Sequence, residues 1–567
     1  MNRPRSFLKS VCPFRIVRRA TTPRCLLFIA STCAFATAQA RLLPSLEEAY
    51  RSDDLTAFTN QLRLGADPNS LVAGVPLLHQ AAEDRRFEYA KHLLWRGADV
   101  LAKDAHGHIA LDRLTDLELD DESLELHYLL RAHALVREHA RPAQPITRPN
   151  LVILFEPTVD YLHPEIAPHY YVNSTELSGS PGVDDDANGF TDDVYGWTIR
   201  HERPHLLTPI QEVILRSRSA QISRLLGLYS RIVTGELTVH SPEVQALHRS
   251  FTNPIAGLFG RSMGFSDFAF MKHLVELSHG THVAGVVIEA SKREALVHTL
   301  SWDGFEDGGE WYTEVFPSPR SGSFDDYVKQ LREDLLPELM RMGLRGSDYI
   351  RATGAGVVNG SFGLNFEGLI PIAQRLATAM VLHDPENLAQ FNTLVVRLAI
   401  ELYAYLTVPY VMVVGENPDV FFVAAAGNSS MNNDLTLQSP AYLSRFFPNL
   451  ITVAAEAREA GEGPSVFTNF GAKSVNIATP GTAIQSLGVG GTRVRMDGTS
   501  QAAPRVAGLA AMVRHRRPDI SAVQLRRGFE FTANREEAWE GLVSDGVLNE
   551  GKFMVHMFMD RLLRVPD

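Results

Sequence analysis

The sequence predicts an α/β protein that is preceded by a small all-α repeat module on its amino-terminal side. Apolar runs at residues 152–155 and 420–426 have the length and composition of buried strands. Helices are predicted to begin at His279 and at Ser500, each after a loop of small residues. Buried strands that are interspersed with helices are typical of a sheet covered by helical layers.

An internal repeat within residues 43–138 predicts the all-α module. The segment Gly65-Ala66-Asp67 recurs 32 residues later as Gly97-Ala98-Asp99. Leucine- and alanine-rich stretches follow each copy, and this period resembles that of ankyrin repeats. Such a module is either a surface that binds a partner protein or a structural cap on the rest of the chain.

Residues 1–40 are predicted to be a signal peptide. Their basic residues precede an apolar run at 25–36, and Ala38-Gln39-Ala40 forms a small-residue cleavage site. A single membrane anchor is the alternative, but the apolar run is short for one. All three cysteines lie in this segment, so the mature chain would have no disulfides. We therefore expect a secreted or periplasmic protein, without membrane contact after cleavage.

The charge balance bears on the partners of the protein. The whole chain has a formal net charge of −12, from 54 basic and 66 acidic residues. Without the seven basic residues of the leader, 47 basic residues would face 66 acidic ones. This negative excess disfavours nucleic acids and anionic membranes as partners.

A proline-rich linker at 139–149 separates the repeat module from the main domain, which we expect to span 150–567. Helical insertions are expected to decorate that domain. They are predicted at about 209–232, 325–341, 369–382 and 385–406.

Ser500 begins the predicted helix at 500–514. Gly498 allows a sharp turn before it, and Pro504 is expected in the first helical turn, where a missing N–H costs little. The partial positive charge at a helix start favours a developing oxyanion. Ser500 is therefore a candidate nucleophile, although a lone serine at this place is more often an N-cap.

Two histidines, His279 and His282, lie three residues apart after another small-residue loop. Such a pair can indicate a metal site, but the carboxylate of a His-Glu-x-x-His motif is absent. We therefore interpret His279, which we expect to open its helix, as a general base for Ser500.

Asn428 follows the predicted strand at 420–426. Its side-chain amide could donate to an oxyanion at the end of that strand. A single asparagine in this place is more often a turn residue.

Together these segments resemble the subtilisin-like serine peptidases (subtilases) over about residues 150–533. The resemblance rests on His-Gly-Thr-His-Val-Ala-Gly from His279, on Ala-Ala-Ala-Gly-Asn ending at Asn428, and on Gly-Thr-Ser-Gln-Ala-Ala-Pro around Ser500. It implies a mostly parallel sheet flanked by helices. It also implies that Ser500 is the nucleophile, His279 the base and Asn428 the oxyanion donor, with no cofactor required for the chemistry.

A further segment, residues 357–363, is similar to the substrate-binding strand of the family. The resemblance implies that Ser361, Phe362 and Gly363 pair with a protein or peptide substrate. Pairing of this kind reads the peptide backbone more than its sequence.

The acidic member of the family's triad departs from the pattern. The family has Asp-Thr/Ser-Gly, whereas this chain has Glu156-Pro157-Thr158, and Asp160 aligns with the family's second aspartate. Glutamate can orient an imidazole, but a misplacement of about 1 Å can cost on the order of 100-fold in rate. Thr158 is also ill suited to a turn that needs a positive φ. Glu156 is therefore either the triad carboxylate or a solvated strand-end carboxylate.

An acidic stretch is the one metal candidate. Asp184, Asp186 and Asn188 alternate and are followed by glycine, as at the start of a calcium loop. The final glutamate of such a loop is missing, and Asp192 or Asp193 would replace it. The stretch is either a structural calcium site or an acidic surface turn.

The sequence thus predicts a secreted serine endopeptidase that acts through an acyl-enzyme. Its triad, Glu156, His279 and Ser500, follows the acid–His–Ser order of subtilisin. The alternative is a catalytically weak or inactive pseudopeptidase that acts as a protein-binding module.

Overall fold

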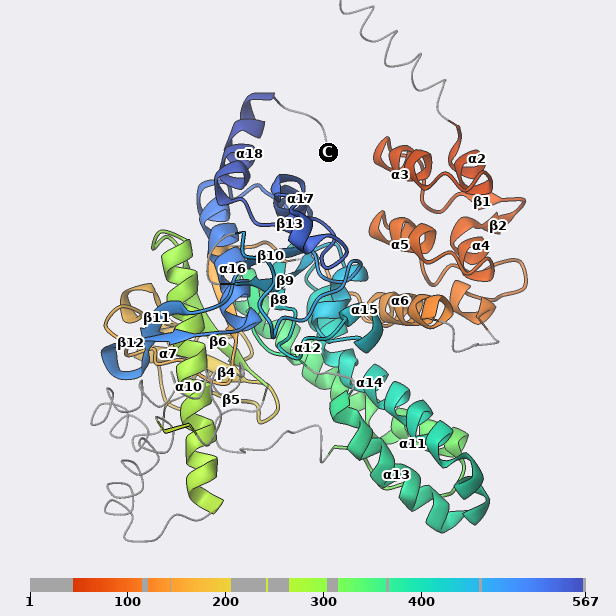
Figure 1. Ribbon diagram of the computed structural model, residues 1–567, viewed down its shortest axis with the longest axis horizontal. Coiled ribbons are helices and arrows are strands. Elements are labelled where there is room, and N and C mark those ends of the chain that lie inside the picture. Colours follow the sequence, from red (N-terminus) through yellow and green to blue (C-terminus); the bar gives the residue numbers. More distant parts are fainter. Residues whose placement is uncertain are drawn as a thin grey trace, which may run out of the picture.

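A nine-stranded sheet forms the centre of the molecule (Figure 1). The computed structural model describes residues 44–563 except 115–120, 143, 205–206, 208–240, 243–264, 303–314, 364–366 and 458–460. The predicted leader at 1–40 and the predicted helix at 209–232 therefore lie outside the described residues. In sheet order the strands are β13 (Gly546–Val547), β10 (Ile477–Pro480), β9 (Leu450–Glu456), β8 (Phe421–Ala425), β7 (Ala355–Gly360), β3 (Arg148–Phe155), β6 (Leu296–Ser301), β4 (Gly196–Thr198) and β5 (Arg203–Pro204).

Neighbouring strands of this sheet run parallel, except that β4 and β5 are antiparallel. The predicted α/β class with a mostly parallel sheet is confirmed. A separate antiparallel hairpin is formed by β11 (Ile484–Gly488) and β12 (Thr492–Met496). Because parallel strands meet at one edge with their carboxyl ends, residues that follow β3, β7 and β8 lie near one another.

Both faces of the sheet are buried, which explains the continuous apolar runs in its strands. Alternate residues of β3 enter different cores: Ile153 packs with one set of helices, whereas Val152 and Leu154 pack with another. One face is covered by α10 (Phe265–Ala290), α16 (Thr499–Arg516), α17 (Ala522–Thr532) and α18 (Glu550–Leu563). The other face is covered by α12 (Leu336–Thr353) and α14 (Phe391–Gly415).

The insertions form a helical lobe that projects from the sheet (Figure 1). It contains α11 (Phe324–Asp334), α12, α13 (Ile370–His383) and α14. The helix predicted at 325–341 is in fact divided at Leu335 between α11 and α12. Among the described residues, only the stretch Pro385–Gly415 is long and apolar enough to span a membrane. Since 78% of its most apolar window is buried in the protein, it also fits a core helix.

The amino-terminal region consists of stacked helix pairs (Figure 1). The helices are α2 (Leu46–Arg51), α3 (Leu55–Arg63), α4 (Leu77–Glu83), α5 (Phe87–Trp95) and α6 (Asp121–Glu138), with a short hairpin of β1 (Leu71–Val72) and β2 (Val75–Pro76). The repeated glycines Gly65 and Gly97 adopt φ values of +93° and +89° just beyond α3 and α5. The sequence repeat therefore marks equivalent left-handed turns at successive helix ends.

A buried ion-pair cluster joins these helix pairs to the main domain. Arg445, which is 4% exposed, lies 2.6 Å from the carboxylate of Glu125 and 3.2 Å from that of Glu88. Tyr442 also donates a hydrogen bond to Glu125. Burial raises the pKa of Glu125, although Arg445 opposes this shift. One hydrophobic core continues across this junction from the helix pairs to one face of the sheet, so the two parts pack as one body.

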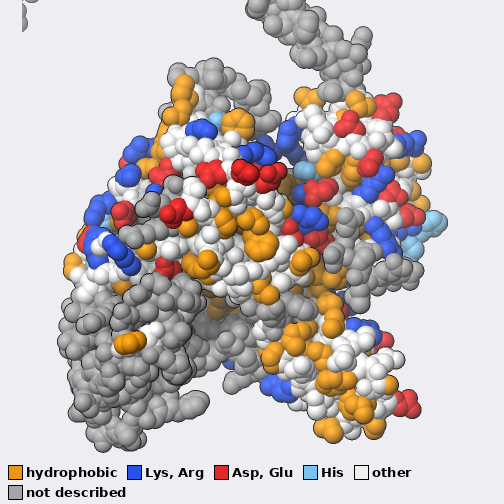
Figure 2. Space-filling view, viewed as in Figure 1, with side chains coloured by type: hydrophobic (Ala, Val, Ile, Leu, Met, Phe, Trp, Pro, Cys, Tyr) orange, Lys and Arg blue, Asp and Glu red, His pale blue; other side chains and the backbone are white. Residues whose placement is uncertain are grey.

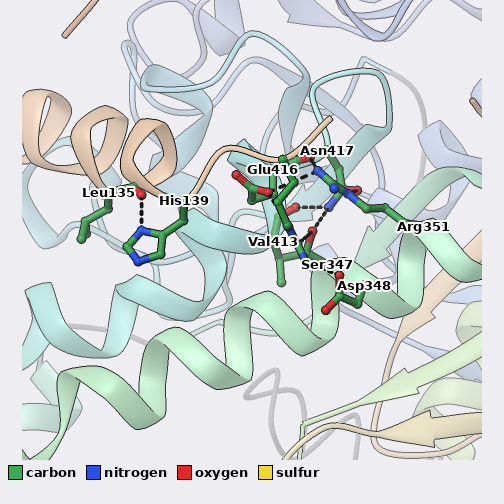
Figure 3. Close-up of polar contacts among 9 residues, drawn as sticks. Leu135, His139, Ser347, Asp348, Arg351, Val413, Glu416 and Asn417 are labelled. Atoms are coloured by element: carbon green, nitrogen blue, oxygen red, sulfur yellow. Dashed lines mark hydrogen bonds and ion pairs between the residues drawn. The ribbon is translucent and has the colours of Figure 1, made fainter. Parts of the chain in front are cut away.

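The linker is fastened to the helical lobe by Arg141. Its Nε donates to Glu416 Oε2 at 3.0 Å, and its guanidinium also pairs with Asp348. Glu416 accepts a second cation, Arg351, at 3.2 Å. Figure 3 shows Arg351, Glu416 and Asn417 directed toward one another beside the linker. The side chain of Glu416 is 1% exposed, so its charge depends on these two arginines.

We expect Arg445→Met to weaken the junction strongly, because it leaves the buried carboxylate of Glu125 without its cation. Loss of one partner from a buried pair costs about 3–5 kcal/mol. The matched control is Arg493→Met, which removes an exposed pair with Glu165 and should cost less than about 1 kcal/mol. Urea unfolding of the two variants measures the difference, and equal midpoints would contradict the importance of the buried cluster.

Candidate active site

Glu156 and His279 meet at the carboxyl end of β3. Glu156 directly follows the strand, and its Oε2 lies 2.8 Å from Nδ1 of His279. The glutamate side chain is 1% exposed and the imidazole is 28% exposed. A carboxylate at this atom can hold the ring in one orientation and stabilise its protonated form.

His279 lies inside α10, which begins at Phe265, so the prediction that it opens the helix is wrong. The small residues around it serve close packing instead. A Cβ on Gly280 would lie 2.0 Å from the carbonyl oxygen of Thr158 and 3.3 Å from Cβ of Glu156. The glycine therefore lets α10 approach the turn after β3 closely enough for the Glu156–His279 contact.

Thr158 is not one of the residues that adopt a positive φ in the described part of the chain. The turn after β3 therefore does not require that conformation at this position. The concern about threonine at this position is therefore removed. Asp160 is also buried, and its backbone N–H donates to Thr281 Oγ1 at 2.9 Å. The turn is thus tied to α10 on either side of Gly280.

Ser500 is the second residue of α16 and is 8% exposed. Its Oγ donates to the carbonyl oxygen of Ser361 at 3.0 Å, and Ser361 Oγ donates to the carbonyl oxygen of Ser500 at 3.1 Å. This reciprocal pair ties the start of α16 to the end of β7.

Pro504 is the sixth residue of α16, so its expected place in the first turn is wrong. In a regular helix the N–H of residue 504 would donate to the carbonyl of Ser500. Proline has no such donor. The carbonyl of Ser500 is therefore open to Ser361 Oγ, and the proline contributes to the link between α16 and β7.

The side chain of Asn428 is oriented by Thr499. Asn428 Oδ1 accepts hydrogen bonds of 2.9 Å from both the N–H and the Oγ1 of Thr499. Two donors on one atom identify it as the oxygen. Nδ2 has no hydrogen-bond partner in the part of the chain that is described. An amide held in this way can present its N–H group to an oxygen atom beside Ser500.

The predicted substrate edge, Ser361 to Gly363, follows β7. Phe362 packs at ring distances of 5.4 Å from Phe155 and 5.7 Å from Tyr410. Gly363 is exposed, and a Cβ there would meet Gln438 at 1.9 Å. The edge therefore has a fixed aromatic anchor beside an exposed backbone position.

The acidic stretch is organised around Glu176, which the sequence reasoning missed. Carboxylate oxygens of Glu176, Asp184 and Asp186 lie within 4.8 Å of one another. Asp193 is buried, and its carboxylate accepts from Asn173 at 2.7 Å and from Asn188 at 3.3 Å. Burial raises the pKa of Asp193 to about 6. Glu176 lies outside the alternating pattern, so its spacing could not have revealed it.

We expect Gly280→Ala to destabilise the protein, because the new methyl group would collide with backbone rather than with a flexible side chain. Overpacking of this kind costs typically 1–3 kcal/mol. Gly551→Ala is the matched control, since its nearest neighbour would be Asn549 Oδ1 at 3.5 Å. Thermal melts of the two variants give the comparison; a Gly280 variant as stable as the Gly551 variant would refute the close approach.

Comparison with known proteins finds a family match over part of the chain. Residues 272–547 match the model of the subtilase family, named Peptidase S8. This range includes His279, Asn428 and Ser500 but begins after Glu156. Subtilisin BL of Lederbergia lenta is 35% identical over 114 residues, which are 20% of this chain and 39% of that protein. Subtilisin-like protease 2 of Plasmodium falciparum is 41% identical over 92 residues, 16% of this chain and 6% of that protein.

Solved structures give a wider but weaker likeness. A lanthipeptide protease covers 74% of this chain and 90% of its own, with 14% identity and a TM-score of 0.36. A structure of the subtilase cytotoxin SubAB assembly covers 52% and 80%, with 20% identity and a TM-score of 0.32. The chain spans less than two-fifths of the curated relatives named above. The family match and the subtilisin homologues support a subtilisin-like peptidase domain in this chain.

Proposed function

We propose that the protein is a serine endopeptidase in which Glu156, His279 and Ser500 act as the triad. The observation that carries the proposal is the 2.8 Å contact between Glu156 Oε2 and His279 Nδ1. It joins a buried carboxylate to a partly exposed imidazole at the same sheet edge that holds Ser500. The family match over residues 272–547 adds support for peptide-bond hydrolysis.

In the proposed reaction, His279 removes the proton from Ser500 Oγ as that oxygen attacks the peptide carbonyl. The carboxylate of Glu156 stabilises the resulting imidazolium. The amide of Asn428 and the N–H of Ser500 donate to the oxyanion. The imidazolium then protonates the leaving amine, and water hydrolyses the acyl-enzyme in a second addition.

Two features support reduced activity, and they favour the pseudopeptidase as the second candidate. Ser500 Oγ donates to Ser361 rather than to an imidazole in this conformation, so the hydroxyl must turn before reaction. Glu156 Oε1 is buried and has no hydrogen-bond partner among the described residues. A carboxylate held through one oxygen is less firmly oriented than one held through both.

Variants of the protein, assayed on one substrate, separate the roles of the acidic residues. We expect Ser500→Ala to abolish hydrolysis of an unfolded protein such as casein. Glu156→Gln keeps the shape but cannot stabilise the imidazolium, and a comparable change in another triad lowers kcat by about 10⁴. Asp160→Asn is the matched control, because Asp160 is a second buried carboxylate in the same turn, and we expect this variant to lose much less activity.

The reverse pattern would reassign the carboxylate. If Asp160→Asn were inactive while Glu156→Gln retained full kcat, Asp160 would be the orienting group. If the wild-type protein did not hydrolyse any protein substrate, the pseudopeptidase would be the better description. Circular dichroism of each variant distinguishes a lost catalytic group from a lost fold.

We propose export to the periplasm or the medium, with cleavage after Ala40. We also propose that the stacked amino-terminal helix pairs are ankyrin-like and present a surface to a partner protein. The recurring left-handed glycines Gly65 and Gly97 support a true structural repeat.

We further propose that the acidic stretch holds a structural calcium ion. The carboxylates of Glu176, Asp184 and Asp186 converge, and Asn188 and Asp193 add oxygen atoms beside them. Clustered oxygen ligands of this kind suit calcium. A bound cation would offset the repulsion between these carboxylates and so stabilise the loop.

Chelation should therefore lower the melting temperature. Calcium at 100 times its Kd stabilises a protein by about 2.7 kcal/mol, so EDTA should shift the melting curve by several degrees. Asp186→Asn should reduce that shift, whereas Asp325→Asn, at an exposed position on α11, should not. A melting curve unchanged by EDTA, together with protein free of calcium by elemental analysis, would leave only the acidic-turn interpretation.

A further inference from the structure

A cleft separates the amino-terminal helix pairs from the carboxyl-terminal helices. It has a volume of about 780 Å³ and is bordered by α3 and α5 on one side and by α17 and α18 on the other. Figure 2 shows blue Lys and Arg side chains at the hollow between these two parts. The volume falls within the range of ligand-binding sites, about 300–1,000 Å³.

The walls of this cleft are rich in arginine. Four arginines and a single glutamate line it. The glutamate, Glu530, is already held by Arg526 Nε at 2.7 Å and by Asn476 Nδ2 at 3.1 Å. Arg526 is itself buried and lies 5.0 Å from the ring of Trp95. Glu530 and Arg526 thus satisfy each other at the base of the cleft.

The helix-pair wall keeps an excess of positive charge. Arg63 ends α3 and Arg96 caps α5, and neither guanidinium has a partner in the described part of the chain. His92 between them adds no charge at neutral pH, because burial and the nearby Lys91 lower its pKa to about 4. The chain as a whole has a net charge of −12, so this positive wall is a local exception.

The opposite wall offers an apolar contact. Phe531 near the end of α17 is 79% exposed, and its ring lies 5.2 Å from that of His556. An aromatic ring left this open at the mouth of a cleft loses contact with water when a ligand covers it. The cleft therefore combines Arg63 and Arg96 on the helix-pair wall with an exposed aromatic side chain on the α17 wall, which also carries Arg526 and Arg527.

We propose that this cleft binds an acidic polypeptide segment that carries an apolar side chain. Carboxylates of the segment pair with Arg63 and Arg96, and its apolar side chain covers Phe531. The negative charge of the rest of the protein repels a polyanion as dense as a nucleic acid. A short peptide with a few carboxylates presents less charge to that field and matches the mixed walls.

The test uses the full chain carrying Ser500→Ala and a fluorescein-labelled, glutamate-rich peptide with one central leucine. Because binding is measured by anisotropy without turnover, the result is independent of the proposed peptidase activity. We expect binding that weakens with salt. Reversal of both charges, Arg63→Glu with Arg96→Glu, should weaken it about tenfold or more. Phe531→Ala should weaken it while leaving the salt dependence unchanged.

Arg495→Glu is the matched control, since Arg495 is an exposed arginine on β12 outside the cleft, and its reversal should leave binding unchanged. Arg63 and Arg96 also favour the ends of their helices electrostatically, so melting curves accompany each variant. If the double reversal unfolds the helix pairs, peptide binding is measured instead with the double variant Arg63→Gln with Arg96→Gln. The proposal would be overturned if a folded double variant bound the peptide as tightly as the unreversed protein. It would also be overturned if the protein bound a single-stranded oligonucleotide more tightly than the peptide.

Discussion

The close approach of α10 to the turn after β3 is the constraint on which the site depends. Gly280 allows this approach, because any larger residue would meet the carbonyl oxygen of Thr158. The contact between Glu156 and His279 follows from it. The same helix packs against α16 on one face of the sheet. The position of His279 relative to Ser500 is therefore fixed by the packing of two buried helices rather than by a flexible loop.

Backbone groups complete the arrangement around Ser500. Pro504 leaves the carbonyl of Ser500 without its helical donor, and Ser361 takes that place. Thr499 uses both its N–H and its hydroxyl to orient Asn428. Hydrogen bonds of small residues thus link the start of α16 to the ends of β7 and β8. Larger side chains at these positions would separate the elements that the proposed chemistry needs together.

Much of the fold and part of the candidate site could be predicted from sequence, because local residue patterns indicate them. The apolar runs at β3 and β8 are buried strands, and Glu156, which aligns with the acidic member of the family's triad, contacts His279. The start of α10 was missed because the small residues near His279 resemble a helix start but serve packing. Glu176 was missed because it lies outside the alternating acidic pattern. The junction at Arg445 was missed because it joins residues 320 positions apart in sequence. No local spacing records such contacts.

Ser500 is proposed to be a serine that is activated by His279, whose imidazole is supported by the carboxylate of Glu156. Fluorophosphonates react quickly only with a serine that is activated in this way. Labelling of the purified protein, with the modified peptide identified by mass spectrometry, tests the claim most directly. We predict labelling at Ser500 that is lost in His279→Ala. An unlabelled wild-type protein, or labelling that persists without His279, would contradict it.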